Sequence, residues 1–171
     1  MLDALDLAKA HFWGYSMGGW IGFGMARYAP ERVDRLVIGG SDPYARNQEP
    51  AREFYNAHLD DSADDFVTAL EDRFGAQVSP ARKMRLCNLD RRALLALSQD
   101  RPELSDMLSN MRMPCCLYAG EADPACEPAK SASARIPGAL FFSLPGLNHP
   151  GAFRSSDRVV PRVMSFLRGQ T

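Results

Sequence analysis

The sequence predicts an α/β fold: a mostly parallel sheet of about four strands, flanked by helices and interrupted by a helical insertion. Two observations support this class. Short apolar runs that end in turn residues alternate with segments of helical periodicity, which is the pattern of a parallel sheet covered on both faces. A long, densely charged stretch interrupts this alternation. The length of 171 residues, with 46% hydrophobic and 24% charged residues, fits one soluble globular unit.

The charge balance and the termini exclude several classes of protein. Twenty Lys and Arg against 21 Asp and Glu leave no electrostatic reason to expect nucleic acid or a membrane surface as a partner. The longest uncharged stretch, Ala10 to Ala26, contains five glycines and is shorter than the ~20 apolar residues that cross a bilayer. The acidic start of the chain lacks the basic and apolar regions of a secretory signal. We therefore expect a cytoplasmic protein whose four cysteines, which have no CxxC spacing, are free thiols.

Four elements are expected before the insertion. They are a helix over 2–9, a strand over 10–13, a helix over 17–28 and a strand over 35–38. The first strand ends at Gly14, and the second helix stops at Ala29 because the residue before a proline avoids helical geometry. The second strand runs into a cluster of turn residues over 39–43.

The insertion is expected over residues 44–112, so that the core consists of residues 1–43 and 113–171. The insertion has helical spacing, and Ser62 and Ser79 stand where a hydroxyl can cap a helix. The elements expected after it are a strand over 115–120, a helix over 128–135, a strand over 140–144 and a helix over 157–167.

The motif G-x-S-x-G occupies residues 14–18, between the first strand and the helix that follows it. A sharp strand-to-helix turn exposes the serine as a nucleophile, and it needs small residues, here Gly14 and Gly18, on either side. Ser16 is therefore the candidate nucleophile. The backbone N–H of Met17, at the start of the helix, is the candidate donor to an oxyanion.

A serine hydroxyl needs a base, usually a histidine, which in turn needs a carboxylate to fix its tautomer. His11 begins the strand that leads to Ser16 and should lie far from the hydroxyl, while His58 is expected to be a solvated residue of the insertion. His149 follows the last strand and should emerge at the same edge of the sheet as Ser16. His149 is therefore the candidate base.

Two aspartates stand in equivalent positions, each just past a strand and each followed by proline: Asp42 and Asp123. Either could orient His149. Asp123 is preferred because its strand precedes, in sequence, the strand that carries His149, and Asp42 is the alternative acid. The aspartate that does not contact the base is expected to stabilise a turn.

Four stretches resemble the α/β-hydrolase superfamily, and in particular its serine esterases. They are Gly14-Tyr15-Ser16-Met17-Gly18-Gly19, residues 29–37, Gly120-Glu121-Ala122-Asp123-Pro124 and Asn148-His149. The resemblance implies a partial α/β-hydrolase fold with Ser16 as nucleophile, Asp123 as acid, His149 as base and Met17 as backbone donor to the oxyanion. It also implies that the insertion is a cap that sets substrate choice. No metal or organic cofactor is implied.

The chain departs from this family at its start, because members normally carry several strands before the nucleophile. The nucleophile strand is therefore expected at a sheet edge, where an unpaired apolar strand favours a homo-oligomer. The second oxyanion donor normally comes from the missing part, and a second chain could supply it.

The expected function is hydrolysis of a carboxylic ester or similar acyl compound through an acyl-enzyme. Two alternatives remain at this point. One is a non-catalytic relative that binds a small molecule or partner. The other is a related activity of the same triad, such as perhydrolysis, lactone opening or C–C bond hydrolysis.

Overall fold

The computed structural model describes residues 1–74 and 77–170, so residues 75–76 of the expected insertion and Thr171 of the expected core lie outside the described part. The chain forms two compact units, Met1–Tyr44 with Glu103–Thr171 and, inserted between them, Ala45–Pro102. The expected insertion extended to residue 112. Residues 103–112 instead fold with the first unit, because Leu104, Leu108 and Met111 are buried in its hydrophobic core.

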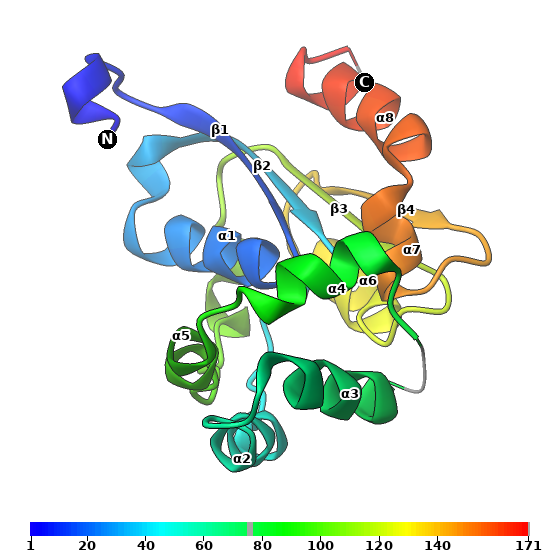
Figure 1. Ribbon diagram of the computed structural model, residues 1–171. Helices are drawn as coiled ribbons and strands as arrows, with labels where there is room; N and C mark the ends of the chain where they lie inside the picture. The colour runs from blue at the N-terminus through cyan, green and yellow to red at the C-terminus, as the bar shows by residue number, and fades with distance from the viewer. Residues whose placement is uncertain (75–76, 171) are drawn as a thin grey trace. The chain divides into compact units, whose positions relative to one another are not determined.

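The first unit is built on a parallel sheet, as the sequence predicts. Within the described residues the sheet has four strands in the order β1-β2-β3-β4 (Figure 1). They are β1 (Ala10–Tyr15), β2 (Val33–Gly39), β3 (Cys115–Gly120) and β4 (Leu140–Leu144). Every residue of β3 is buried, which is why this central strand is a continuous apolar run in the sequence. The strand β1 stands at one edge of this sheet.

Helices cover the sheet in two layers. Helices α1 (Met17–Tyr28) and α6 (Cys126–Arg135) and the 3-10 helix η3 (Ser105–Asn110) contribute to one apolar cluster, and α7 (His149–Arg154) and α8 (Ser156–Leu167) contribute to another. Cys115 belongs to the first cluster and Cys116 to the second, so these neighbours point to opposite faces of β3. The core of the unit therefore lies on both sides of the sheet.

Two short segments differ from the sequence-based expectation. The helix expected over 2–9 is wrong: only a 3-10 turn, η1 (Asp3–Leu5), forms there, and Asp6 ends it with a left-handed φ of 53°. The helix α7 was not expected, because its six residues are too few to show a periodic pattern. A further 3-10 turn, η2 (Pro30–Arg32), joins α1 to β2.

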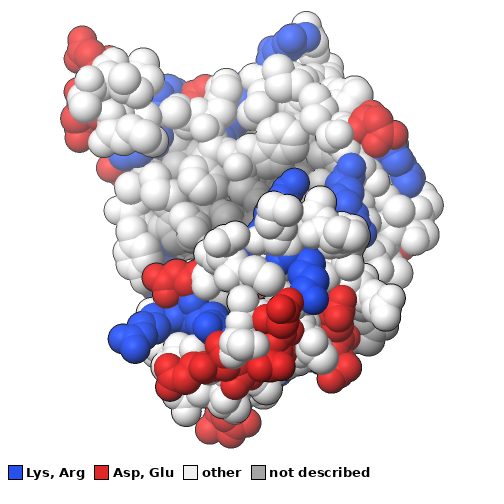
Figure 2. All heavy atoms as spheres, viewed as in Figure 1, with Lys and Arg blue, Asp and Glu red and all other residues white. Residues whose placement is uncertain are grey.

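The second unit is helical, as expected. It contains α2 (Glu49–Ala57), α3 (Ala63–Phe74), α4 (Pro80–Cys87) and α5 (Arg91–Leu97), with α2 packed on α5 and α3 on α4. The Ser62 hydroxyl accepts a hydrogen bond from the Asp65 N–H at 3.1 Å, as predicted, whereas the Ser79 side chain makes no capping bond. Figure 2 shows acidic side chains gathered on this unit. Those of α3 are Asp64, Asp65, Glu71 and Asp72.

Within the described residues, no helix combines the length and the apolar character needed to cross a membrane.

Candidate active site

The turn between β1 and α1 holds Ser16 in a strained conformation. Ser16 has φ 55° and ψ −115°, a region that residues other than glycine rarely adopt. Such a backbone costs on the order of 1–3 kcal/mol and is typical of functional sites. The turn therefore has the form of the strained nucleophile elbow that the motif predicts.

The glycines around Ser16 do not contribute equally. A Cβ on Gly14 would overlap the backbone carbonyl of Gly18, so the chain cannot turn here unless residue 14 is glycine. The expectation that Gly18 must also be small is wrong, because a Cβ at that position would meet no atom within 4 Å. The crowded position is the next one, Gly19, where a Cβ would lie 2.8 Å from the Ser41 Cβ.

Ser16, His149 and Asp123 form a continuous row of hydrogen bonds. The Nε2 of His149 lies 3.0 Å from the Ser16 Oγ, and its Nδ1 lies 2.6 Å from the Asp123 Oδ2. The three residues follow β1, β4 and β3, whose carboxyl ends share one edge of the sheet. The Asp123 side chain is 3% exposed and that of His149 is 37% exposed, so the carboxylate is shielded from water while the imidazole remains accessible.

The structure separates the two candidate acids. In both, Oδ1 accepts a hydrogen bond from the N–H two residues ahead: Asp123 from Ala125 at 2.9 Å and Asp42 from Tyr44 at 3.2 Å. Asp123 also presents its second carboxylate oxygen to His149. Asp42 stabilises the turn after β2, as the sequence predicts for one of the two aspartates.

The other two histidines have carboxylate partners of their own. His11, at the opposite end of β1, places its Nδ1 3.1 Å from the Asp34 Oδ2. His58 was expected to be solvated, but it is half-buried in the second unit, with its Nδ1 2.7 Å from the Asp61 Oδ2. His149 is thus the histidine that the fold brings to the serine.

Met17 is the first residue of α1, a helix of 12 residues. The first N–H groups of a helix have no acceptor within the helix, and they carry the positive end of its dipole. A negatively charged oxygen beside the Ser16 hydroxyl would therefore be stabilised at this end of the helix.

Sequence reasoning missed Tyr15. Its hydroxyl donates a hydrogen bond of 2.7 Å to the backbone carbonyl of His149, and the two ring centroids are 5.1 Å apart. Burial, and then the negative charge of Asp123, raise the pKa of the Tyr15 phenol. The only signal in the sequence was that Tyr15 precedes the nucleophile, because the position between Gly and Ser in the motif accepts any residue.

No group of three or more His, Cys, Asp or Glu side chains is placed to hold a metal ion in the part of the chain that the structure describes. Burial raises the pKa of the Cys115 and Cys116 thiols to about 12, so neither is a reactive nucleophile at neutral pH.

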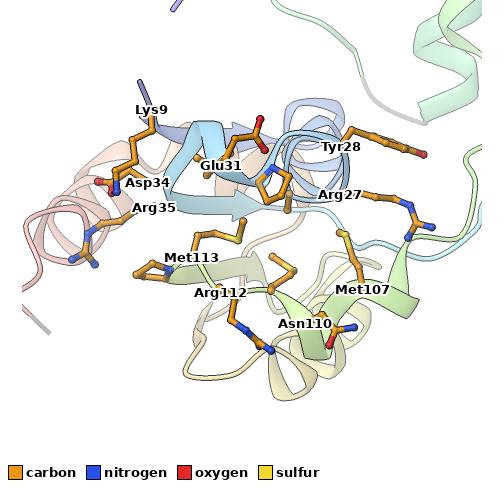
Figure 3. Close-up of a pocket in the computed structure, with 15 residues that line it drawn as sticks. Lys9, Arg27, Tyr28, Glu31, Asp34, Arg35, Met107, Asn110, Arg112 and Met113 are labelled. Carbon is orange, nitrogen blue, oxygen red and sulfur yellow. The ribbon is translucent and has the colours of Figure 1, made fainter. Parts of the chain in front are cut away.

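A cavity of about 940 Å³ lies at the opposite end of the sheet, beside the first residues of β2 and β3. Figure 3 shows Lys9 and Asp34, which form an ion pair of 2.6 Å, on one side of it and Arg27 and Met107 on the other. None of the three residues of the hydrogen-bonded row lines this cavity. Ligands of open α/β sheets bind at the carboxyl ends of the strands, so size alone does not make this cavity the active site.

Comparison with known families identifies the class of protein to which this fold belongs. The profile of the alpha/beta hydrolase fold matches residues 1–158, and the chain belongs to this family. It also matches 38 residues, 22% of this chain and 10% of the other, of the dihydrolipoyllysine-residue acetyltransferase component of the acetoin cleaving system of Pseudomonas putida, at 50% identity.

Solved structures share the fold over nearly the whole chain. A hydrolase from Pseudomonas aeruginosa PA01 is 24% identical, with a TM-score of 0.79 over 97% of this chain and 67% of its own length. The enol-lactonase from Burkholderia xenovorans LB400 is 20% identical, with a TM-score of 0.79 over 98% of this chain and 68% of its own length. A thermophilic esterase from Thermogutta terrifontis is 19% identical, with a TM-score of 0.75 over 99% of this chain and 68% of its own length. The chain thus spans about two thirds of their length.

Proposed function

We propose that the protein is a serine hydrolase that cleaves a carboxylic ester or a similar acyl compound through an acyl-enzyme. The observation that carries this proposal is the row in which His149 Nε2 lies 3.0 Å from Ser16 Oγ and His149 Nδ1 lies 2.6 Å from Asp123 Oδ2. A base in hydrogen-bond reach of a serine, itself oriented by a buried carboxylate, is the arrangement that activates a hydroxyl.

The reaction begins when Ser16 Oγ attacks the acyl carbon and His149 Nε2 takes the hydroxyl proton. The carbonyl oxygen becomes an oxyanion, which the Met17 N–H stabilises. The tetrahedral intermediate collapses, the bond to the leaving alkoxide breaks, and His149 returns the proton to it. Water then attacks the acyl-enzyme with His149 again as base, and the acid leaves as Ser16 regains its proton. Asp123 holds the Nδ1–H and stabilises the imidazolium throughout.

The names of two solved neighbours fit this chemistry, since one is described as an enol-lactonase and another as an esterase. Lactone opening uses the same steps on a cyclic ester, so it is a variant of the proposal rather than a different mechanism. Perhydrolysis and C–C bond hydrolysis would use the same three side chains with another acceptor or leaving group. The assignment of substrate choice to the inserted unit rests on the family resemblance and is part of the proposal.

Hydrolysis of 4-nitrophenyl acetate and butyrate by the purified chain tests the proposal. We expect turnover that Ser16→Ala abolishes, together with loss of labelling by a fluorophosphonate probe. The matched control is Ser143→Ala, which removes a hydroxyl that donates to Glu121 rather than to His149. Turnover or labelling that persists in Ser16→Ala contradicts the assignment of the nucleophile. A wild-type chain with neither activity favours the alternative of a non-catalytic binding protein.

A further inference from the structure

We propose that Tyr15 is a positioning residue that fixes the base of the active site by holding the backbone of His149. This inference deepens the proposed function and rests on it. It concerns the residue directly before the nucleophile, which donates a hydrogen bond of 2.7 Å to the His149 carbonyl.

The imidazole of His149 is engaged at both nitrogens, by Ser16 and by Asp123. These two bonds set the rotation of the ring, but they leave the position of its backbone to the surrounding chain. The Tyr15 bond supplies a third point of attachment, at the carbonyl. His149 is thus held at three atoms, its two ring nitrogens and its carbonyl oxygen, by residues at the β1–α1 turn and in the loop after β3.

The backbone of His149 needs such an anchor because its own helix is short. His149 begins α7, which has only six residues, and helices of this length are not stable by themselves. The Asn148 side chain caps the helix by accepting the Gly151 N–H at 2.9 Å, which orders the turn locally. That bond lies within the loop, so it cannot fix the loop relative to Ser16. The Tyr15 hydroxyl does so across 134 positions of sequence.

The end of β2 is shaped around the contact between Tyr15 and His149. A Cβ on Gly40 would lie 2.7 Å from the Tyr15 Cζ, 2.8 Å from its hydroxyl oxygen and 3.1 Å from the His149 Cε1. Gly40 also has φ 54°, which favours glycine. A Cβ on Gly39 would overlap the rings of Tyr15 and Tyr118. These two glycines thus leave the space that the phenol and the imidazole share.

The contact couples the His149 loop to the nucleophile because of where Tyr15 lies in the chain. Tyr15 and Ser16 are consecutive, so one backbone segment carries both the nucleophile and the anchor of the base. A shift of the elbow moves Ser16 and, through Tyr15, the loop of His149 in the same direction. The distance between Oγ and Nε2 is therefore protected against motion of the two loops relative to each other. Because burial raises its pKa, the phenol keeps its donor proton at neutral and mildly alkaline pH.

Tyr15→Phe tests the inference, since it removes the hydroxyl and keeps the ring. The matched control is Tyr118→Phe, because Tyr118 is the neighbouring tyrosine on the same face of the sheet, and its hydroxyl accepts from the Trp13 indole N–H. We expect the kcat for 4-nitrophenyl butyrate and the fluorophosphonate labelling rate to fall about tenfold in Tyr15→Phe, with KM within twofold. In Tyr118→Phe the kcat, the labelling rate and the KM should all stay within twofold of wild type. Equal losses in the two variants, or no loss in Tyr15→Phe, overturn the inference.

Two further readouts separate positioning from a merely structural role. In a His149→Ala background, Tyr15→Phe should leave the residual labelling rate unchanged, whereas a general destabilisation would lower it again. By NMR, the Nδ1 proton of His149 should exchange with water faster in Tyr15→Phe than in wild type or Tyr118→Phe. The exchange measurement does not depend on turnover. If the wild type shows no Ser16-dependent activity, the proposed function fails while proton exchange still decides the role of Tyr15. Equal exchange in all three proteins refutes that role.

Discussion

Asp123 and Asp42 can each be replaced by asparagine to test whether contact with His149 or burial in a turn matters for activity. The two aspartates are matched in burial, at 5% exposure each, and in the turn that they stabilise through Oδ1. Asparagine keeps an oxygen that can accept the turn N–H, so both variants should fold. They differ in the second oxygen, which in Asp123 lies 2.6 Å from the Nδ1 of His149. We therefore expect Asp123→Asn to lose activity and Asp42→Asn to keep it.

The magnitude follows from the charge that develops on His149 as it takes the proton from Ser16. At 2.6 Å and an effective dielectric constant of about 20, a carboxylate stabilises an imidazolium by about 6 kcal/mol as an upper limit. At 1.36 kcal/mol per factor of ten, this corresponds to a loss in kcat of about 10⁴-fold. A loss of the same order accompanies the change of a triad aspartate to its amide in serine proteases, where the amide selects the wrong tautomer.

The assay is kcat for 4-nitrophenyl butyrate at pH 8, with Ser16→Ala as the baseline and circular dichroism as the check on folding. Asp42→Asn should stay within threefold of wild type. The reasoning is refuted if a folded Asp123→Asn retains more than a tenth of the wild-type kcat. It is also refuted if Asp42→Asn loses as much activity as Asp123→Asn, because the turn would then matter more than the contact with His149.

Three further predictions concern the elbow, the thiols and the sheet edge. Gly14→Ala should abolish folding or activity, because a Cβ at residue 14 would overlap the backbone, whereas Gly18→Ala should keep kcat within threefold of wild type. Thermal unfolding and ester hydrolysis measure both variants, and equal effects in the two contradict the steric argument. Because the pKa of Cys115 and Cys116 is raised to about 12, both should resist iodoacetamide at pH 8 in the native state and react after unfolding, as mass spectrometry can measure. We also propose that β1, an edge strand whose Trp13 is 40% exposed, pairs with the β1 strand of a second copy of the chain. Light scattering should then give the mass of a dimer, and a monomeric mass at micromolar concentration refutes this.

The sequence was most informative where burial constrains it most. The bounds of β3 agree with the expected range, and the strand was recognisable because all its residues are apolar or small and buried on both faces. Ser16 was identifiable because the strained turn requires glycine at residue 14. In each case one strong physical constraint acts on a short stretch of chain, and such constraints leave a local pattern.

Features that depend on distant contacts left no such pattern. Leu104 and Leu108 have the same helical spacing as residues of the insertion, and only their burial in the first unit separates them from it. Ser79 stands before a proline like a helix cap, but its side chain does not cap the helix. Tyr15 contacts a carbonyl 134 positions away, so nothing near it in the sequence indicates its partner.

The choice between the two acids shows how topology carries information that spacing does not. Asp42 and Asp123 have the same local setting, so no local rule separates them. In the sheet, β3 lies next to β4, and the last residue of each, Gly120 and Leu144, is paired with the other. The loop after β3 is therefore the neighbour of the loop that carries His149, while the loop after β2 is one strand further away. The contact between Asp123 and His149 thus follows from the strand order, in which strands consecutive in the sequence are neighbours in the sheet.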